Sequence, residues 1–392
     1  MAPNSDDSPG KKRGRKVRVD FRKNREKVRR DKSEHTRQFR AGEPGSADAP
    51  ASESVRAKGA LSRRRTIIED GDKGDDHPPG DGRVTAVRGL VVEVESQGRR
   101  WACTVRRVLR TRMIEERSPV AVGDAVQFSP VSAAGETSRL SCGDELLPEG
   151  VIESVAPRRT TLVRYYEHRS QVIAANVDTV VVTVAADQPT LRPHLIDRYL
   201  ISIHQGDMRP VICINKADLD TDAAAAAVAD DFSRLGYRAI LTSVPRQRGL
   251  DDLRDAVRDI TSVFVGPSGV GKSTLINALA PHLAREIGDL TDLHRGKHTT
   301  TTAQLLRWPF GGHVVDTPGM RQFELPPVAR EELEAYFIEF VERVAHCRFA
   351  DCSHVHEADC AIRAAVDAGD ISPRRYGSYC KMYEECAARS AY

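Results

Sequence analysis

The sequence has no long hydrophobic run. None of its apolar stretches approaches the ~18 residues that suggest a membrane span, and its N-terminus lacks the apolar core of a secretory signal. It also lacks a disulfide framework, because its eight cysteines are either scattered or clustered at a spacing typical of metal ligands. We therefore expect a cytoplasmic protein with no membrane partner.

A large net charge is absent as well, since the formal charge is only +3 over 392 residues. The small total conceals a basic arm in residues 1–78. The run Lys11–Arg25 continues basic through Arg40 with almost no aliphatic side chains, and a second basic cluster, Arg63–Arg65, lies in a stretch dominated by Gly, Pro, Ala and Ser. Such a segment cannot bury enough apolar area to offset its ordering entropy, so we expect disorder. The arm could neutralise nucleic-acid phosphates. A solubilising tail and a localisation signal are the alternatives.

Residues 79–168 alternate short apolar runs with glycine-containing turns. Several short strands in this arrangement predict a small barrel, and an OB-like β-barrel would suit single-stranded or structured RNA. The expected strands are Arg83–Val87, Gly89–Val94, Arg100–Val105, Val120–Phe128 and Gly150–Val155. The pattern alone leaves the ligand of the barrel open.

Residues 169–326 alternate strands with helices, which predicts an α/β domain with a mainly parallel sheet. The expected strands are Val180–Val184, Pro210–Ile214 and Ala239–Val244. The expected helices are Pro193–Gln205, Thr221–Leu235 and Leu250–Asp259. The last helix leads into the strand Ser262–Val265 and then into the motif that indicates the chemistry of the domain.

A phosphate-binding loop follows that strand and precedes a predicted helix, the context that gives the G-x-x-x-x-G-K-[ST] pattern its meaning. Its glycines let several backbone N–H groups point at one anion, and the helix N-terminus adds partial positive charge. Lys272 is expected to reach the β- and γ-phosphates, and the Ser273 hydroxyl to bind Mg²⁺. The expected contacts of the triphosphate are Gly266, Pro267, Ser268, Gly269, Val270, Gly271, Lys272, Ser273 and Thr274.

The identity of the nucleotide base is predicted from the motif Asn215-Lys216-Ala217-Asp218, which ends a hydrophobic strand. The Asp218 carboxylate can accept hydrogen bonds from guanine N1–H and the exocyclic amine, a match that adenine cannot offer. Lys216 would lie along the base plane, and Asn215 would join this loop to the phosphate loop. Ser243 ends the next strand, where a base-contacting loop belongs. These residues predict GTP in preference to ATP.

Two segments after the phosphate loop are expected to respond to the γ-phosphate. The polar stretch 288–302 ends in four consecutive threonines, of which we favour Thr300 as a Mg²⁺ ligand beside Ser273. Asp316, at the end of the expected strand 312–316, would hold Mg²⁺ through water, and the Gly319 N–H would sense the γ-phosphate. The stretch 288–302 would therefore order with GTP and loosen with GDP.

The glutamine that orients the attacking water in Ras-like enzymes is missing, because Met320 follows Gly319. Methionine cannot hydrogen-bond the water usefully, so another group must position it. His298 is the nearest candidate in sequence, and Arg321 and Gln322 are less favoured. A slow intrinsic rate that rises when a partner completes the site would follow.

The order of these motifs is unusual. The guanine-reading residues precede the phosphate loop, whereas Ras-like proteins place them after it. A sheet can be cut at one surface loop and rejoined at another without altering its site, so this order predicts a circularly permuted GTPase domain. The chain after Asp316 then leads directly into the C-terminal module, to which a nucleotide-dependent movement could be passed.

Residues 327–392 are predicted to form a small helical module around a metal ion. An amphipathic helix is expected over Pro327–Ala345, followed by several potential ligands within a short span. Three thiolates and one imidazole suit tetrahedral Zn²⁺, and a closed site of this kind is structural. The expected zinc ligands are Cys347, Cys352, His354 and Cys360.

Other residues of the module have secondary places in this interpretation. His346 and His356 are alternative nitrogen ligands ranked below His354, and Cys380 and Cys386 are expected on a later helix without a metal role. The basic side chains of the module suggest a surface for RNA. They are Arg348, Arg363, Arg374, Arg375 and Lys381.

These motifs together resemble the ribosome small-subunit-dependent GTPase A family (RsgA), bacterial permuted GTPases of 30S assembly. The likeness runs from about Gly82 to Arg375 and includes Val122–Asp124 in the barrel and Ala174–Asp178 at the start of the GTPase domain. Lys297–Thr300 looks like the switch signature of the family, whose histidine has been proposed as catalytic there. The four expected zinc ligands match the family in spacing, and Met320 fits a family that lacks the catalytic glutamine.

The resemblance implies a multidomain fold with an OB-like β-barrel, a circularly permuted α/β P-loop GTPase domain and a small α-helical zinc-binding module. It implies binding to the 30S subunit and its 16S rRNA, GTP hydrolysis stimulated there, and release in the GDP state. We expect a monomer. The arm before residue 79 extends beyond the common pattern of the family, so the resemblance implies no role for it.

Two other functional classes were weighed against the sequence. A metabolic kinase would need a phosphoryl-acceptor pocket, which nothing in the sequence resembles, and the guanine motif argues against it. A non-hydrolysing RNA-binding scaffold that uses GTP only for stability is harder to exclude, given Met320. Turnover measured with and without 30S subunits separates the three classes.

Overall fold

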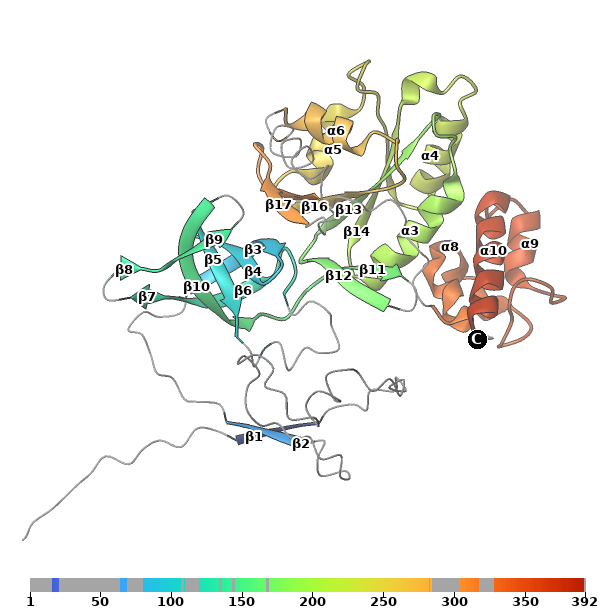
Figure 1. Cartoon of the computed structure of the whole chain (residues 1–392). Coiled ribbons are helices and arrows are strands. Elements are labelled where there is room, and N and C mark those ends of the chain that lie inside the picture. Colours follow the sequence, from blue (N-terminus) through green and yellow to red (C-terminus); the bar gives the residue numbers. More distant parts are fainter. Residues whose placement is uncertain are drawn as a thin grey trace, which may run out of the picture. The chain divides into compact units, whose positions relative to one another are not determined.

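The computed structural model describes residues 16–20, 64–68, 80–106, 109, 120–133, 136–142, 145–166, 169–281, 283, 303–316 and 328–390. They belong to two compact units, 1–76 and 77–392, which are described separately. In the first unit, β1 (Lys16–Asp20) and β2 (Arg64–Ile68) pair antiparallel (Figure 1). The sequence analysis expected no regular structure there. The alternation of charged and β-branched residues in Lys16–Asp20 accounts for the strand.

The second unit begins with a closed barrel. Its strands are β3 (Gly80–Arg88), β4 (Val91–Ser96), β5 (Arg99–Val105), β6 (Ala125–Pro130) and β10 (Glu145–Val155). They lie in the order β3–β4–β5–β10–β6, and β6 pairs in turn with β3, so the ring closes. β5 and β10 are parallel, and the other neighbours are antiparallel. The predicted OB-like β-barrel is confirmed.

Side chains from all five strands fill the barrel. Val84, Val94, Cys103, Phe128 and Ile152 are buried together, as the alternation of inward and outward residues along each strand requires. A short hairpin of β7 (Ser132–Ala133) and β8 (Glu136–Thr137) follows β6, and β9 (Arg139–Cys142) pairs with the first half of β10.

The α/β domain contains a six-stranded part of the sheet in the order β15–β14–β13–β16–β18–β17. Only β17 is antiparallel to its neighbour β18. The strands are β13 (Thr179–Ala185), β14 (Arg209–Asn215), β15 (Arg238–Leu241), β16 (Thr261–Val265), β17 (Gln304–Arg307) and β18 (His313–Asp316). The predicted mainly parallel sheet is confirmed.

Helices cover both faces of this sheet (Figure 1). α3 (Pro193–Gln205) and α4 (Ala224–Arg234) pack on the face that receives Val180 and Val182, and α5 (Leu250–Val257) and α6 (Lys272–Leu279) pack on the face that receives Val181. This alternation explains why β13 is uniformly apolar. α4 begins later than the predicted Thr221, because the Asp220 carboxylate accepts hydrogen bonds from the first helical N–H groups.

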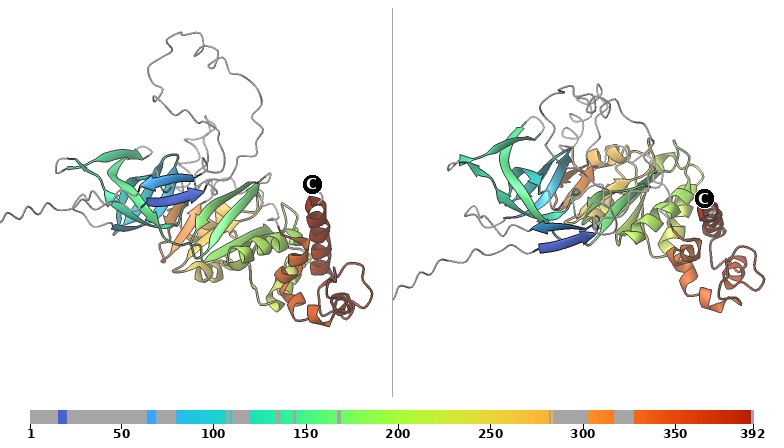
Figure 2. Two further views of the ribbon diagram at one scale, coloured as in Figure 1. Left: turned by 90° about the horizontal axis from the view of Figure 1, so that it is seen from below. Right: turned by 60° about the horizontal axis from the view of Figure 1, so that its bottom comes forward.

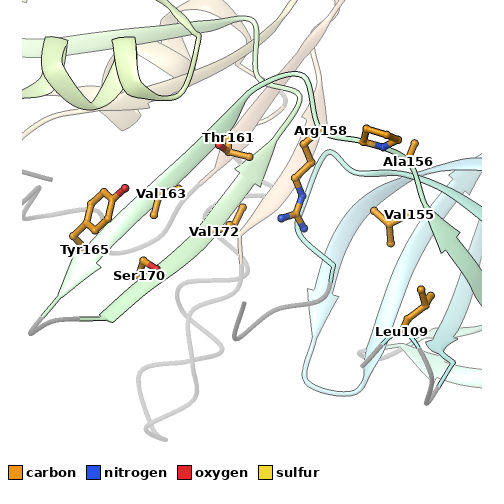
Figure 3. A pocket seen from close by; sticks show the side chains of 10 residues that line it. Leu109, Val155, Ala156, Arg158, Thr161, Val163, Tyr165, Ser170 and Val172 are labelled. Atoms are coloured by element: carbon orange, nitrogen blue, oxygen red, sulfur yellow. The ribbon is translucent and has the colours of Figure 1, made fainter. Parts of the chain in front are cut away.

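A hairpin of β11 (Thr161–Tyr166) and β12 (Arg169–Ala175) joins the barrel to the sheet. The boundary predicted between residues 168 and 169 falls within it. An open pocket of about 550 Å³ lies between this hairpin and the end of β10, and Figure 3 shows the side chains that line it. Its lining is mainly apolar and includes Val155, Val163, Val172 and Tyr165.

Close backbone contacts form a seam between the barrel and the α/β domain. The Ala175 N–H donates to the Val122 carbonyl at 2.8 Å, and the side-chain amide of Asn176 donates to the Gly123 carbonyl at 3.0 Å. Gly123 has φ +90°, and a Cβ there would lie 2.1 Å from the Ala175 oxygen, so only glycine fits. The predicted strand Val120–Phe128 therefore begins only at Ala125.

Charged groups reinforce this seam. Asp124 is fully buried and receives two hydrogen bonds from Arg158, at 2.8 and 3.0 Å. Arg83 of the barrel donates to the Thr261 hydroxyl at 2.7 Å and contacts Nδ1 of His313 at 3.3 Å. Burial and then the charge of Arg83 lower the pKa of His313, so its ring is neutral at pH 7 and can accept this bond.

The C-terminal module contains η3 (Arg330–Tyr336), α8 (Ile338–Val341), η4 (Val344–His346), α9 (Ala361–Asp367) and α10 (Pro373–Ser390). The prediction of one helix over Pro327–Ala345 is wrong, because the chain is extended at Phe337 (φ −103°, ψ 92°). The break lets Phe337 and Phe340 both pack on Tyr379, with ring centroids 5.3 and 4.9 Å away.

The module packs directly on α3 (Figures 1 and 2). Ile201 of α3 belongs to the apolar core of the module, and Arg198 of α3 pairs with Glu385 of α10. Arg375 is 1% exposed and donates to Glu339 at 2.7 and 2.8 Å and to Asp197 of α3 at 2.7 Å. A buried ion-pair joint therefore fixes the module to the α/β domain.

This joint corrects the predicted RNA surface. Arg375 is buried, and Arg374 bonds Asp197 at 3.2 Å and lies 4.7 Å over the ring of Phe232. Both were predicted to face RNA, and for them the prediction is wrong. Arg348, Arg363 and Lys381 are exposed. Within the described ranges, no helix is long and apolar enough to cross a membrane.

We expect Arg375→Ala to reduce the free energy of unfolding by about 3–5 kcal/mol, because the buried Glu339 carboxylate loses both hydrogen bonds from Arg375 and Asp197 keeps only its longer bond from Arg374. Urea denaturation measures this change. Lys381→Ala, at an exposed position of the same helix, is the matched control and should change stability by less than about 0.5 kcal/mol. Equal stabilities of the two variants would contradict a buried joint.

Candidate nucleotide site and metal centre

The phosphate loop connects β16 to α6, and its glycines are required by close neighbours. A Cβ at Gly266 (φ +146°) would lie 2.0 Å from the Thr183 oxygen of β13, and one at Gly271 (φ +94°) would lie 2.4 Å from Asn215 Nδ2. The loop is therefore pressed against two neighbouring strands, where any side chain would collide. The Lys272 ammonium donates to the carbonyls of Gly266 and Pro267, at 2.8 and 2.7 Å, which holds it over the loop.

The guanine motif is bound to this loop through Asn215. Its side-chain amide donates to the Val270 carbonyl at 2.9 Å and accepts from the Thr242 hydroxyl at 3.1 Å. Asn215 is 3% exposed, so neither bond competes with bulk water. The structure thus places Asn215 between the two loops, as its predicted role requires.

Asp218 lies beside Ser243, at the carboxyl ends of β14 and β15. The Ser243 hydroxyl donates to the Asp218 carboxylate at 2.5 Å, and this hydrogen bond is the main reason that the pKa of Asp218 is lowered. The carboxylate is therefore ionised and held in place, ready to accept N–H donors. Lys216, with φ +58°, donates to the Gln188 carbonyl.

The segment after β13 was missed by the sequence analysis. Gln188 receives the Lys216 ammonium, and Pro189 lies 3.8 Å from the point where a Cβ of Gly269 would stand. Both loops of the candidate site therefore border this segment. The segment directly follows a fully buried strand. This position could have indicated that the segment belongs to the site, since ligands of such sheets bind at the carboxyl ends of strands.

Asp316 is the last residue of β18, at the same carboxyl edge as the phosphate loop and the guanine motif. Burial raises its pKa, so a nearby cation would favour the ionised form. His298, Thr300, Gly319 and Met320 lie outside the described residues, as do the less favoured Arg321 and Gln322. Their roles stay predictions.

The C-terminal module brings together a metal-ligand cluster. The ligand atoms of Cys347, Cys352, His354 and Cys360 all lie within 4.8 Å of one another. His354 Nδ1 lies 3.5 Å from the sulfur of Cys347 and 3.4 Å from that of Cys360, and these two sulfurs are 4.0 Å apart. Thiolates bound at ~2.3 Å in a tetrahedron would lie roughly 3.8 Å apart, so the cluster fits a four-coordinate metal ion.

The alternative ligands are not part of this cluster. Among the residues that the structure describes, the group excludes His346, His356, Cys380 and Cys386. Burial raises the pKa of Cys352, and a bound cation would favour its thiolate form. The cluster has the composition and spacing of a metal site.

We expect Asn215→Ala to weaken guanine-nucleotide binding and to lower the free energy of unfolding by roughly 1–3 kcal/mol, because the buried Val270 carbonyl loses its donor. Titration with fluorescent GDP and urea denaturation measure the two effects. Gln247→Ala is the matched control, since its exposed amide bonds only the Val244 carbonyl of its own loop. Wild-type behaviour of Asn215→Ala in both assays would show that the two Asn215 hydrogen bonds, here called the Asn215 clamp, do not hold the two loops together.

Comparison with known proteins agrees with this geometry. The family described as RsgA GTPase matches residues 155–326. The small ribosomal subunit biogenesis GTPase RsgA of Azotobacter vinelandii is 38% identical over 332 residues, 83% of this chain and 91% of the relative. The namesake protein of Chlorobaculum tepidum is 38% identical over 316 residues, 78% of this chain and 98% of the relative.

Two solved structures share the fold. The crystal structure of YjeQ from Thermotoga maritima has a TM-score of 0.62 and 32% identity, covering 79% of this chain and 99% of that chain. That of YloQ, described as a circularly permuted GTPase, has a TM-score of 0.59 and 28% identity, covering 81% of this chain and 98% of that chain. With the motif order and the clamped nucleotide loops, these matches show that the chain belongs to the RsgA family of circularly permuted GTPases.

Proposed function

We propose that this protein is a cytoplasmic, monomeric assembly factor of the small ribosomal subunit. It binds 16S rRNA on the 30S particle in its GTP state, hydrolyses GTP when the particle stimulates it, and leaves in the GDP state. The relatives named for small-subunit biogenesis support this proposal. The observation that carries the nucleotide half is the Asn215 clamp, which joins a guanine-reading loop to a phosphate loop.

Four parts of the chain would share this work. Residues 1–78 form a basic arm, 79–168 the RNA-binding barrel, 169–326 the GTPase domain, and 327–392 the zinc module. On the barrel, the exposed Arg99 guanidinium lies 4.9 Å over the ring of Trp101. Stacked cationic and aromatic groups of this kind suit unpaired bases. The exposed Arg348, Arg363 and Lys381 would add phosphate contacts from the zinc module.

In the proposed reaction the chain acts mainly by positioning and electrostatics. Backbone N–H groups of the loop 266–274, in which Pro267 has none to donate, and the Lys272 ammonium hold the β- and γ-phosphates, and Asp218 with Ser243 holds the guanine. Ser273 and Thr300 would ligate Mg²⁺, with Asp316 reaching it through water. The ion, when bound, neutralises charge that develops on the phosphate oxygens. The Gly319 N–H would bond the γ-phosphate and would thereby sense which nucleotide is bound.

The C-terminal cluster would hold one structural zinc ion. Three thiolates and one imidazole are the donors that Zn²⁺ prefers, and their mutual distances suit its tetrahedral geometry. Tyr376 and Tyr379 fix the ligand loop by donating to the carbonyls of His354 and Ser353, at 2.8 and 2.9 Å. The ion would therefore join this loop to the aromatic core of a module that is small for independent folding.

The central experiment measures GTP turnover with and without purified 30S subunits. We expect stimulation of at least ~10-fold by 30S and none by 50S subunits, because a partner must complete a site that lacks the Ras-like glutamine. An equal rate with and without 30S would reject the assembly-factor proposal. Hydrolysis that stays undetectable while GTP binds would favour the non-hydrolysing scaffold instead.

We expect His298→Ala to reduce 30S-stimulated turnover by roughly 100-fold while GTP affinity stays nearly unchanged, since the histidine is proposed to position the attacking water rather than to bind the nucleotide. Single-turnover assays on the 30S complex measure the rate. His294→Ala, from the same polar segment, serves as the matched control. Unchanged stimulated turnover in the His298 variant would remove this residue from the mechanism.

A further inference from the structure

The nitrogen ligand of the metal cluster has a second polar contact. His354 is fully buried, and its two ring nitrogens face different groups. Nδ1 faces the sulfurs of Cys347 and Cys360, whereas Nε2 lies 2.7 Å from the carboxylate of Glu334. Glu334 itself is not among the clustered ligands, since the ring of His354 lies between its carboxylate and the sulfurs.

This arrangement decides where the imidazole carries its proton. A metal ion among the sulfurs needs the lone pair of Nδ1, so the proton of a neutral ring has to be on Nε2, where it can be donated to Glu334. Without an acceptor, the two tautomers of a histidine are close in energy. A carboxylate behind the ring selects the ligating tautomer, orients the ring and makes the ligating nitrogen more basic.

Apart from the sulfurs that face Nδ1, Glu334 is the one side chain that offers the ring a hydrogen bond among the residues that the structure describes. Phe340 and Tyr379 contact the ring only as aromatic neighbours, with centroids 6.0 and 6.1 Å away. The bond from Tyr376 goes to the backbone carbonyl of His354 and does not restrain rotation of the ring. The Glu334 contact is therefore the polar restraint on the Nε2 side of the ring.

Glu334 reaches the cluster from a separate element. It lies on η3, and its neighbour Leu333 is fully buried in the core of the module, which fixes where η3 sits. His354 follows 20 residues later. The carboxylate is thus supplied by packing of η3 and not by the ligand loop.

We propose that Glu334 is a positioning residue for the metal, which holds His354 in the ligating tautomer and orientation and thereby raises metal affinity. The inference rests on the zinc site put forward under the proposed function. It assigns a role to a residue outside the ligand set and makes metal affinity depend on the placement of η3.

The test uses the full-length chain and competition for Zn²⁺ with a chromophoric chelator. We expect Glu334→Ala to lower zinc affinity by roughly 10- to 100-fold, the usual effect of losing such a partner. Glu334→Gln should lose less, because its amide oxygen still accepts the Nε2 proton although it carries no charge. Glu332→Ala is the matched control, since Glu332 is exposed on the same element.

Cobalt substitution separates positioning from ligation. Glu334→Ala loaded with Co²⁺ should keep the full thiolate-to-cobalt charge-transfer intensity of the wild type, whereas Cys347→Ser should lose about a third of it, one thiolate of three. If Glu334→Ala proves unfolded, Glu334→Gln carries the affinity test. Affinities of both Glu334 variants equal to that of Glu332→Ala would overturn this inference. A wild-type chain that binds no zinc would instead reject the zinc site itself.

Discussion

The side-chain amide of Asn215 holds the nucleotide site together. One end of the amide engages the phosphate loop at Val270 and the other the guanine side at Thr242, and Gly271 has no Cβ that would displace it. Both bonds lie across the carboxyl edge of the sheet. These two hydrogen bonds can therefore form whichever loop comes first along the chain. This cross-link explains how a permuted sequence can keep the spatial arrangement of a guanine-nucleotide site.

Two motifs that carry the family resemblance contact each other and not the described residues of that site. Val122–Asp124 and Ala174–Asp178 lie against each other at the seam, where Gly123 approaches the Ala175 carbonyl and Asp178 accepts from the Thr261 N–H at 2.8 Å. Their role is to join the barrel to the amino ends of the strands whose other ends bear the phosphate loop and Asp316. Close backbone packing at a seam of this kind restricts which residue types fit as strongly as a role in the nucleotide site does.

The sequence predicted the features that depend on local spacing. The phosphate loop, the guanine motif, the sheet and the Cys/His cluster all follow from residues close together in the chain. The features that it missed depend on tertiary packing. The break at Phe337 exists because two aromatic rings reach one core, and the burial of Arg375 depends on carboxylates of Asp197 and Glu339 that are distant in sequence. Glu334 was missed for the same reason, since no spacing rule connects it to His354.

The joint made by Arg375 has a consequence for how the protein would engage a large particle. The joint gives the C-terminal module one fixed position on α3, and the seam gives the barrel one fixed position at the amino ends of the strands. If both ends contact rRNA, the second contact is intramolecular, and its effective concentration is greatest where the two rRNA sites match the span between the ends. A particle whose sites stand at another distance would be held by one end only. The residence time of the protein on a particle would then depend on whether the two rRNA sites have reached the distance that both ends can span.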